Sequence, residues 1–179
     1  MKTKKLVITI LMIIIIMGSL SAATPSVFDV GVLNYYKIQS LADTDFASYT
    51  PGLRLEAHIV PWFGLGLDAL IETPFVDNGS FDILATTDIT FRAPIGFFEP
   101  YIALGPAYRI AITSGAVALT KDVAYSARAG FDFNITSIFT IGAEAKLVVD
   151  DLPGVIAGTA GTIDWLDSTL VGLTLKAKF

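Results

Sequence analysis

The sequence predicts an all-β fold: an eight-stranded antiparallel up-and-down transmembrane β-barrel. The chain of 179 residues is 53% hydrophobic with a mean hydropathy of +0.65, yet only 16% of its residues are charged, against roughly 25% in a typical soluble domain. After residue 23 no stretch is long and apolar enough for a spanning helix, and apolar residues instead recur at every second position. Long and short connections also alternate between the predicted strands, as in barrels that cross a membrane.

The first element along the chain is a signal peptide. Three lysines within the first five residues precede an apolar run at 6–17, and Ser21 and Ala23 fit the −3 and −1 positions of a signal-peptidase site. The run is shorter than the roughly 20 residues of a spanning helix, which argues against an uncleaved anchor. We therefore predict a cleaved signal peptide at 1–23 and an outer-membrane β-barrel domain at 24–179.

Eight strands follow, each with apolar and polar residues in alternation. The alternation is clearest at 53–59, 65–69 and 141–147, and in the last strand, where 171–179 is apolar at every second position. Most of the strands have a length close to that which a tilted strand needs to cross a bilayer. The predicted strands are, in order, 27–38, 53–60, 63–72, 83–93, 101–111, 123–133, 139–149 and 169–179.

The connections between these strands alternate in length, and both ends of the mature chain fall on the short-connection side. Outer-membrane barrels have this arrangement, with short periplasmic turns and longer extracellular loops. The sequence therefore predicts a Gram-negative outer-membrane protein with extracellular loops and both termini in the periplasm. The long connections are 39–52, 73–82, 112–122 and 150–168, and the short ones are 61–62, 94–100 and 134–138.

The aromatic residues fall near the two ends of the predicted strands, which is typical of two interfacial girdles. All 20 of them are assigned to one end or the other, with Tyr101 in the short-connection group and Tyr35 in the long-connection group. A soluble β-sandwich would place Phe and Trp in the middle of its strands, so the aromatic pattern favours the barrel.

Two segments resemble a known family. The sequence PYIALG at 100–105 is similar to a recurrent strand opening of the small eight-stranded outer-membrane barrels, the OmpA/OmpX-like group with OmpW-like proteins as near relatives. The C-terminal segment resembles the signal that the barrel-assembly machinery reads, with a terminal Phe and apolar residues at alternate positions. The resemblance implies outer-membrane lipid and the barrel-assembly machinery as partners. The residues of the C-terminal assembly signal are Val171, Leu173, Leu175, Ala177 and Phe179.

The polar face of the strands carries seven acids, seven lysines or arginines, and the only histidine. An eight-stranded barrel is only wide enough for side chains to fill. We therefore expect an interlocked set of ion pairs in the lumen, because unpaired buried charge is costly. A polar conduit is the alternative, and the narrow interior argues against it. The lumen charge network is predicted to comprise Asp29, Arg54, Glu56, His58, Asp68, Glu72, Asp88, Arg92, Arg109, Arg128, Asp132, Glu144, Lys146, Lys176 and Lys178.

Charge outside the lumen is concentrated in the long connections. Loss of the three signal-peptide lysines changes the net charge from −5 to −8, which argues against nucleic acid as a partner. The acidic loops keep an exposed surface soluble or attract a cationic or protein partner. There is no cysteine and no complete calcium-loop spacing, so we expect no metal and no cofactor. The loop charges are Asp43, Asp45, Asp77, Asp82, Asp122, Asp150, Asp151, Asp164 and Asp167, against Lys121.

These features predict a structural or surface-interaction role and no enzyme activity. The first alternative is transport of small hydrophobic molecules through a lateral opening at Gly105 and Pro106, because a proline inside a strand removes a ladder hydrogen bond. The second is a lipid-modifying enzyme based on His58, which would need a partnering Ser or Asp at the rim. No serine neighbours His58 in the sequence, and no catalytic residue is assigned.

Overall fold

The computed structural model describes residues 26–41, 48–72, 80–113, 116–119, 123–158 and 163–179. The predicted signal peptide lies outside the described residues. The described elements are β1 (Phe28–Lys37), the 3-10 helix η1 (Ile38–Ser40), β2 (Tyr49–Val60), β3 (Phe63–Ile71), β4 (Ser80–Arg92), β5 (Phe98–Thr113), β6 (Ala116–Leu119), β7 (Ala124–Asn134), β8 (Phe139–Val149), α2 (Leu152–Ala157) and β9 (Thr169–Lys178).

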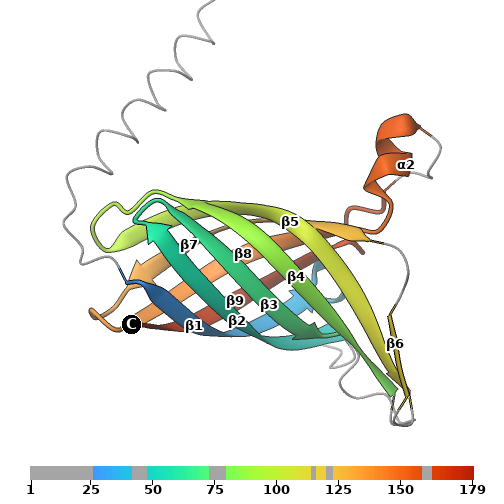
Figure 1. The fold of residues 1–179 in the computed structure, drawn as a ribbon, viewed down its shortest axis with the longest axis horizontal. Helices are drawn as coiled ribbons and strands as arrows, with labels where there is room; N and C mark the ends of the chain where they lie inside the picture. The colour runs from blue at the N-terminus through green and yellow to red at the C-terminus, as the bar shows by residue number, and fades with distance from the viewer. Residues whose placement is uncertain (1–25, 42–47, 73–79, 114–115, 120–122, 159–162) are drawn as a thin grey trace, which may run out of the picture.

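Eight of these strands close into a ring in which every pairing is antiparallel. The strand order β4-β3-β2-β1-β9-β8-β7-β5 is closed by a pairing of β4 with β5, and β6 extends the sheet beyond the ring. The start of β1 and the C-terminus lie at one end of the barrel, whereas α2 and β6 lie at the other (Figure 1). We call these the short-turn end and the long-loop end. The eight-stranded up-and-down β-barrel predicted from the sequence is confirmed.

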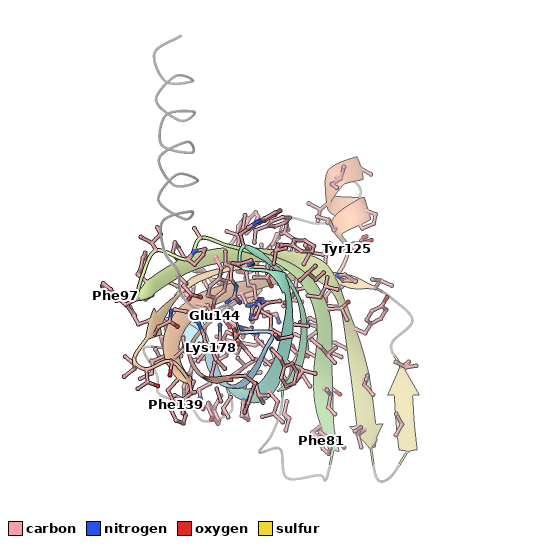
Figure 2. All side chains as sticks on the ribbon, turned by 60° about the vertical axis from the view of Figure 1, so that its left-hand side comes forward. Phe81, Phe97, Tyr125, Phe139, Glu144 and Lys178 are labelled. Atoms are coloured by element: carbon pink, nitrogen blue, oxygen red, sulfur yellow. The ribbon has the colours of Figure 1, made fainter. Side chains whose placement is uncertain are left out.

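Burial alternates along each strand, because successive side chains point to opposite faces of a sheet. In β3, Gly64, Gly66, Asp68 and Leu70 are buried, while the intervening residues are exposed or half-buried. The other barrel strands repeat this pattern, with charged side chains inside the ring and large apolar side chains outside (Figure 2). The described outer wall is therefore apolar and the interior polar, the reverse of a soluble protein.

The segment between β5 and β7, predicted as a long connection at 112–122, contains further strand structure. β5 continues to Thr113, and β6 folds back on it with Ile112 opposite Val117. β-branched residues in both halves of this hairpin favour the extended conformation. The long-loop end thus carries a strand pair that projects past the barrel rim (Figure 1).

The described helical elements are short, and each follows a barrel strand at the long-loop end: η1 follows β1, and α2 follows β8. Asp151 caps α2 by accepting a hydrogen bond from the Gly154 amide, and Gly158 ends the helix in a left-handed conformation (φ 70°). Glycine adopts that conformation without a steric cost. Within the described part of the chain, no helix has the length and apolar character needed to cross a membrane.

Two tyrosines depart from the girdle prediction. Tyr35 and Tyr101 point into the lumen, where they are 0% and 4% exposed, and both hydroxyls donate to Glu144. A tyrosine buried among charged groups is stable when its hydroxyl has such a partner. Assigning every aromatic residue to an interfacial girdle was therefore wrong for these two.

Candidate functional site

The centre of the lumen is an ion-pair cluster built from opposite sides of the ring. Arg54 on β2 donates through Nε to Asp68 (2.6 Å) and through both terminal nitrogens to Glu144 on β8 (2.8 Å each). Lys146 donates to the second oxygen of Asp68 (2.7 Å) and to Thr86 (2.8 Å). These charged side chains are almost fully buried, so each needs the partners that the cluster supplies.

A second arginine extends the cluster toward β4. Arg128 on β7 donates to Asp88 (2.7 Å), to Thr90 (2.9 Å) and, at a longer 3.4 Å, to Glu144. Its guanidinium carbon also lies 5.4 Å from the ring centroid of Tyr101, within the range of a cation–π contact. Glu144 is therefore the acceptor that joins both arginine groups.

The short-turn half of the lumen is organised around a third arginine. Arg92 donates to Glu56 (2.6 Å) and Glu99 (3.3 Å), and Glu99 also accepts from Lys178 (3.1 Å) and from Asn134 (2.5 Å). Figure 2 shows Lys178 and Glu144 inside the ring. The ion pairs therefore continue from the barrel centre to its short-turn mouth.

The remaining contacts in this half leave several polar atoms without a partner. Lys176 donates to Asp132 (2.6 Å), and its ammonium lies 4.7 Å from the centroid of the Tyr101 ring. His58 Nε2 lies 2.9 Å from Asp29 Oδ2. Among the described residues, the buried side-chain atoms that lack a hydrogen-bond partner are Asp29 Oδ1, Glu56 Oε2, His58 Nδ1, Arg92 Nε, Asp132 Oδ1 and Thr174 Oγ1.

An apolar layer separates this polar interior from the long-loop end. Its members come from strand segments next to the long connections and face the inside of the ring, where none is more than 6% exposed. Such a layer is unfavourable for ions and water. The layer consists of Leu33, Tyr35, Leu70, Leu84, Ala107, Ala124, Val148 and Leu170.

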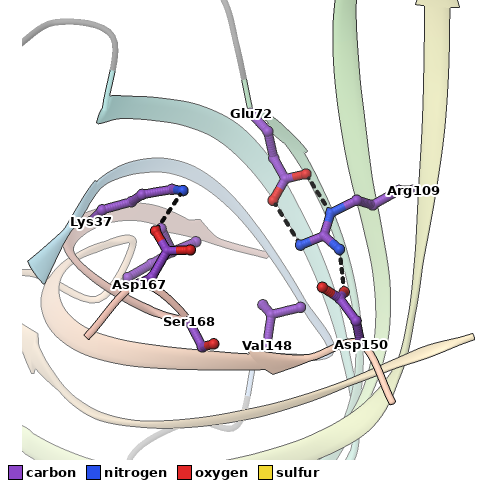
Figure 3. Close-up of a pocket in the computed structure, with 8 residues that line it drawn as sticks. Lys37, Glu72, Arg109, Val148, Asp150, Asp167 and Ser168 are labelled. Atoms are coloured by element: carbon purple, nitrogen blue, oxygen red, sulfur yellow. Dashed lines mark hydrogen bonds and ion pairs between the residues drawn. The ribbon is translucent and has the colours of Figure 1, made fainter. Parts of the chain in front are cut away.

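A small mouth pocket of about 80 Å³ lies on the long-loop side of this layer (Figure 3). Arg109 bridges Glu72 (2.7 Å) and Asp150, and Lys37 pairs with Asp167 at 3.1 Å. The apolar layer contributes Val148 and Leu170 to its lining. The volume is well below the roughly 300 Å³ of ordinary small-molecule sites.

The structure brings the predicted lumen residues together with two qualifications. Glu72 and Arg109 pair with each other in the mouth pocket, and the other thirteen lie on the short-turn side of the apolar layer. Glu99 also belongs to the lumen network, and sequence reasoning missed it. Its position two residues before Tyr101 and four before Ala103, on the same strand face, is the signal that identifies it.

At Gly105 and Pro106 the backbone pairing is interrupted on one side only. Pairing with β7 is continuous, but the ladder between β4 and β5 passes from Thr86–Ala107 directly to Ile89–Leu104. The strands do not separate there, since a Cβ added at Gly105 would lie 1.7 Å from the Thr87 carbonyl oxygen.

Side chains also bridge this interruption inside the lumen. Asp88, on the interrupted part of β4, accepts hydrogen bonds from Ser126 (3.3 Å) and Arg128 (2.7 Å) on β7. These bonds pass β5 and connect its two neighbours. They weigh against a lateral opening at Pro106.

The last strand presents its predicted assembly residues on the outer face. Leu173, Leu175 and Phe179 are 62%, 47% and 69% exposed, and Val171 and Ala177 are half-buried beside them. The intervening Thr174 and Lys176 point into the lumen. The recognition role of this strand stays a prediction.

The acidic residues of the long connections are described in part. Asp150, Asp151, Asp164 and Asp167 are exposed at the long-loop end, and Asp82 is half-buried in β4. The other predicted loop charges lie outside the described residues: Asp43, Asp45, Asp77, Lys121 and Asp122.

His58 forms a His–Asp pair, as the enzyme hypothesis requires, but the pair is buried in the lumen and does not lie at the rim. The His58 and Asp29 side chains are only 4% and 1% exposed, and they lie inside the lumen. The free nitrogen of His58, Nδ1, has no hydrogen-bonded nucleophile among the described residues. The pair is part of the short-turn ion network.

A closed eight-stranded ring with an apolar wall and a charged interior defines a transmembrane β-barrel of the outer-membrane type. Solved structures share this fold. The N-terminal β-barrel domain of Pseudomonas aeruginosa OprF is similar at 16% identity and a TM-score of 0.58, over 85% of this chain and 96% of that chain. Neisserial surface protein A (NspA) is similar at 8% identity and a TM-score of 0.54, over 85% and 96%.

A de novo designed transmembrane β-barrel is also similar, at 13% identity and a TM-score of 0.50, over 87% of this chain and 98% of that one. No protein-family profile and no curated protein sequence matches the chain. At these identities the similarity concerns the fold. The chain has the fold of the small eight-stranded outer-membrane β-barrels, as the resemblance predicted.

Proposed function

We propose that this protein is a structural outer-membrane barrel with a closed lumen, which presents its long-loop end for surface interaction. The observation that carries the proposal is the lumen itself. Ion pairs fill it from the short-turn mouth to the centre, and the apolar layer lies above them. Moving a solvated ion along this path would require breaking several buried pairs, so the barrel serves as an anchor and not as a pore.

Planar-bilayer recording on the refolded protein tests this proposal. We expect no stable conductance above that of the bare bilayer. Insertion is checked separately in vesicles, by co-flotation and by protection of the barrel from protease. This check ensures that a failure to insert is not mistaken for a closed lumen. A stable large conductance from inserted protein would refute the closed lumen.

We further propose that the long loops are extracellular and that both termini are periplasmic. The concentration of exposed aspartates at the long-loop end supports this orientation. The chain has no cysteine, so Asp151→Cys introduces a unique thiol. We expect a membrane-impermeant maleimide to label it in intact cells. A Thr86→Cys variant is the matched control, because Thr86 is fully buried in the lumen and should stay unlabelled. Labelling of Asp151→Cys only after the outer membrane is disrupted would indicate the opposite orientation.

Lateral transport of small hydrophobic molecules is the second candidate, and the interrupted β4–β5 pairing at Gly105 and Pro106 is the observation that favours it. The close approach of Gly105 to Thr87 and the bonds to Asp88 favour a closed wall instead. We expect vesicles with the protein to take up a hydrophobic fluorescent probe no faster than empty vesicles. Faster uptake that Pro106→Val abolishes would favour the lateral route.

A further inference from the structure

The short-turn end of the barrel carries an apolar surface at the very tips of its turns. Its members come from all three turns and from both described chain ends, and they are between 55% and 72% exposed. We call them the short-turn surface: Val27, Trp62, Phe97, Ile135, Ile138 and Phe179.

In the part of the chain that the structure describes, no charged side chain is exposed at this end. The exposed charged side chains of the described residues all lie at the long-loop end, and they are Lys37, Asp150, Asp151, Asp164 and Asp167. The charged groups nearest the short-turn surface, such as Lys178 and Arg92, turn into the lumen, where their side chains are 11% and 3% exposed. A face that ended in bulk water would gain solubility from charges on its rim.

The short-turn surface is continuous with the apolar outer wall. Phe97 stacks on Phe133 of the wall with centroids 6.1 Å apart and an interplanar angle of 19°. The ring centroids of Trp62 and Phe63 are 6.1 Å apart, and those of Phe63 and Phe91 are 5.4 Å apart. Figure 2 shows Phe97 and Phe139 on the outside of the ring. No polar belt separates these tips from the wall that faces lipid.

We propose that the three short turns themselves lie within the lipid interface, among the headgroups and upper acyl chains of the adjoining leaflet. The occupant of the short-turn surface is phospholipid, because the surface extends a lipid-facing wall and consists of aromatic and aliphatic residues, with no exposed charged side chain among them. The barrel is then embedded asymmetrically, with uncharged turns in one leaflet interface and an acidic end in water. This inference rests on the proposed membrane location.

The two tryptophans of the chain provide the test, because one lies at each end. In a Trp165→Phe variant, Trp62 is the only tryptophan, and the change affects an exposed loop side chain (59% exposed) and not the barrel. In phospholipid vesicles we expect its emission to be quenched by bromines on the upper acyl chain and protected from acrylamide. The matched Trp62→Phe variant leaves Trp165, which should show the opposite behaviour. Acrylamide is neutral, so the acidic end does not repel it.

Two further reporters extend the test to the other turns and to the wall. In a chain with both tryptophans replaced by Phe, Phe97→Trp and Ile138→Trp should behave as Trp62 does, and Leu104→Trp reports the middle of the wall. If the turn reporters are open to acrylamide while Leu104→Trp is quenched by lipid bromine, the membrane location stands and the turns lie in water or dock another protein. That result would overturn the inference. If Leu104→Trp also escapes lipid quenching, the proposed membrane location itself fails.

Discussion

Glu144 illustrates how a single lumen residue holds distant strands together. It lies on β8 and accepts hydrogen bonds from Tyr35 on β1, Arg54 on β2, Tyr101 on β5 and Arg128 on β7. Charge-assisted hydrogen bonds to a buried carboxylate are stronger than neutral ones. Loss of this one charge therefore affects five strands at once.

We predict that Glu144→Gln destabilises the barrel by about 3–5 kcal/mol, the range for breaking a buried ion pair, because Arg54 and Arg128 lose their shared acceptor. Urea unfolding in lipid vesicles measures the effect. The control is Asp150→Asn, which removes an ion pair with Arg109 whose acid is 65% exposed, and about 0–1 kcal/mol is expected. Equal free energies of unfolding for the two variants would show that the Glu144 ion pairs stabilise the barrel no more than an exposed ion pair does.

Gly105 is required by a close approach of two backbones and not by a turn. An added methyl group would overlap the Thr87 carbonyl group of β4, which cannot move without separating the strands. We predict that Gly105→Ala costs about 1–3 kcal/mol of unfolding free energy, as overpacking does. Gly66→Ala is the comparison and should cost less, since its methyl would meet side-chain atoms of Arg128 (3.1 Å) and Asp88 (3.7 Å) and no backbone carbonyl. Unchanged stability of Gly105→Ala would mean that the β4–β5 seam is loose, which would favour the lateral route.

At the scale of elements, β6 differs from the eight barrel strands. Each barrel strand has a neighbour on both sides, whereas β6 pairs with β5 alone over four residue pairs. All four residues of β6 are exposed. Its hydrogen bonds therefore contribute little to the closed ring.

We predict that Val117→Pro in β6 leaves the unfolding free energy of the barrel within about 0.5 kcal/mol of the original protein, as for surface substitutions away from the core. Proline removes one ladder donor, so the amides of β6 should exchange hydrogen faster, whereas those of Ala103 and Leu104 in the ring should not change. A large loss of stability would show that the projecting hairpin is coupled to ring closure.

At the scale of the whole molecule, charge is sorted into three zones. The lumen pairs its acids with its bases, the described outer wall carries no exposed charge, and the exposed aspartates gather at the long-loop end. Surface charge acts over about 8 Å at physiological salt, so a cationic partner would approach this end in preference to the other.

We predict that vesicles with the protein bind a lysine-rich peptide at low salt and release it as salt is raised through roughly the physiological range, where the Debye length shortens. A variant with Asp150, Asp151, Asp164 and Asp167 all changed to Asn should bind it more weakly, as measured by co-sedimentation. The matched control changes to Ala four exposed, uncharged residues at the long-loop end, namely Gln39, Thr113, Val117 and Leu119. Salt-independent binding that is equal in both variants would exclude electrostatic attraction by these aspartates.

Much of this architecture was open to prediction because its signals are local. Alternation of side chains along a strand depends on the two-residue repeat alone, so eight strands and the inward direction of residues such as Arg54 and Asp68 follow from the order of residues. The lengths of the connections likewise predict an up-and-down topology. The predictions for Tyr35, Tyr101 and Glu99 were wrong because a position near a strand end does not show which way a side chain points. The alternation with buried neighbours, such as that of Glu99 and Tyr101 with Ala103, is the signal that does.

The partners within the lumen depend instead on the closed ring. Arg54 and Glu144 are 90 residues apart and lie on strands separated by β1 and β9, so their contact requires the register of every intervening pair. The apolar layer arises in the same way, since Leu33, Leu70 and Leu84 reach one level only after the tilt and stagger of the strands are set. The residue order determines which side chains face inward. Ring closure decides which of them meet, because the position of a residue along the barrel axis depends on the register of all the strand pairs together.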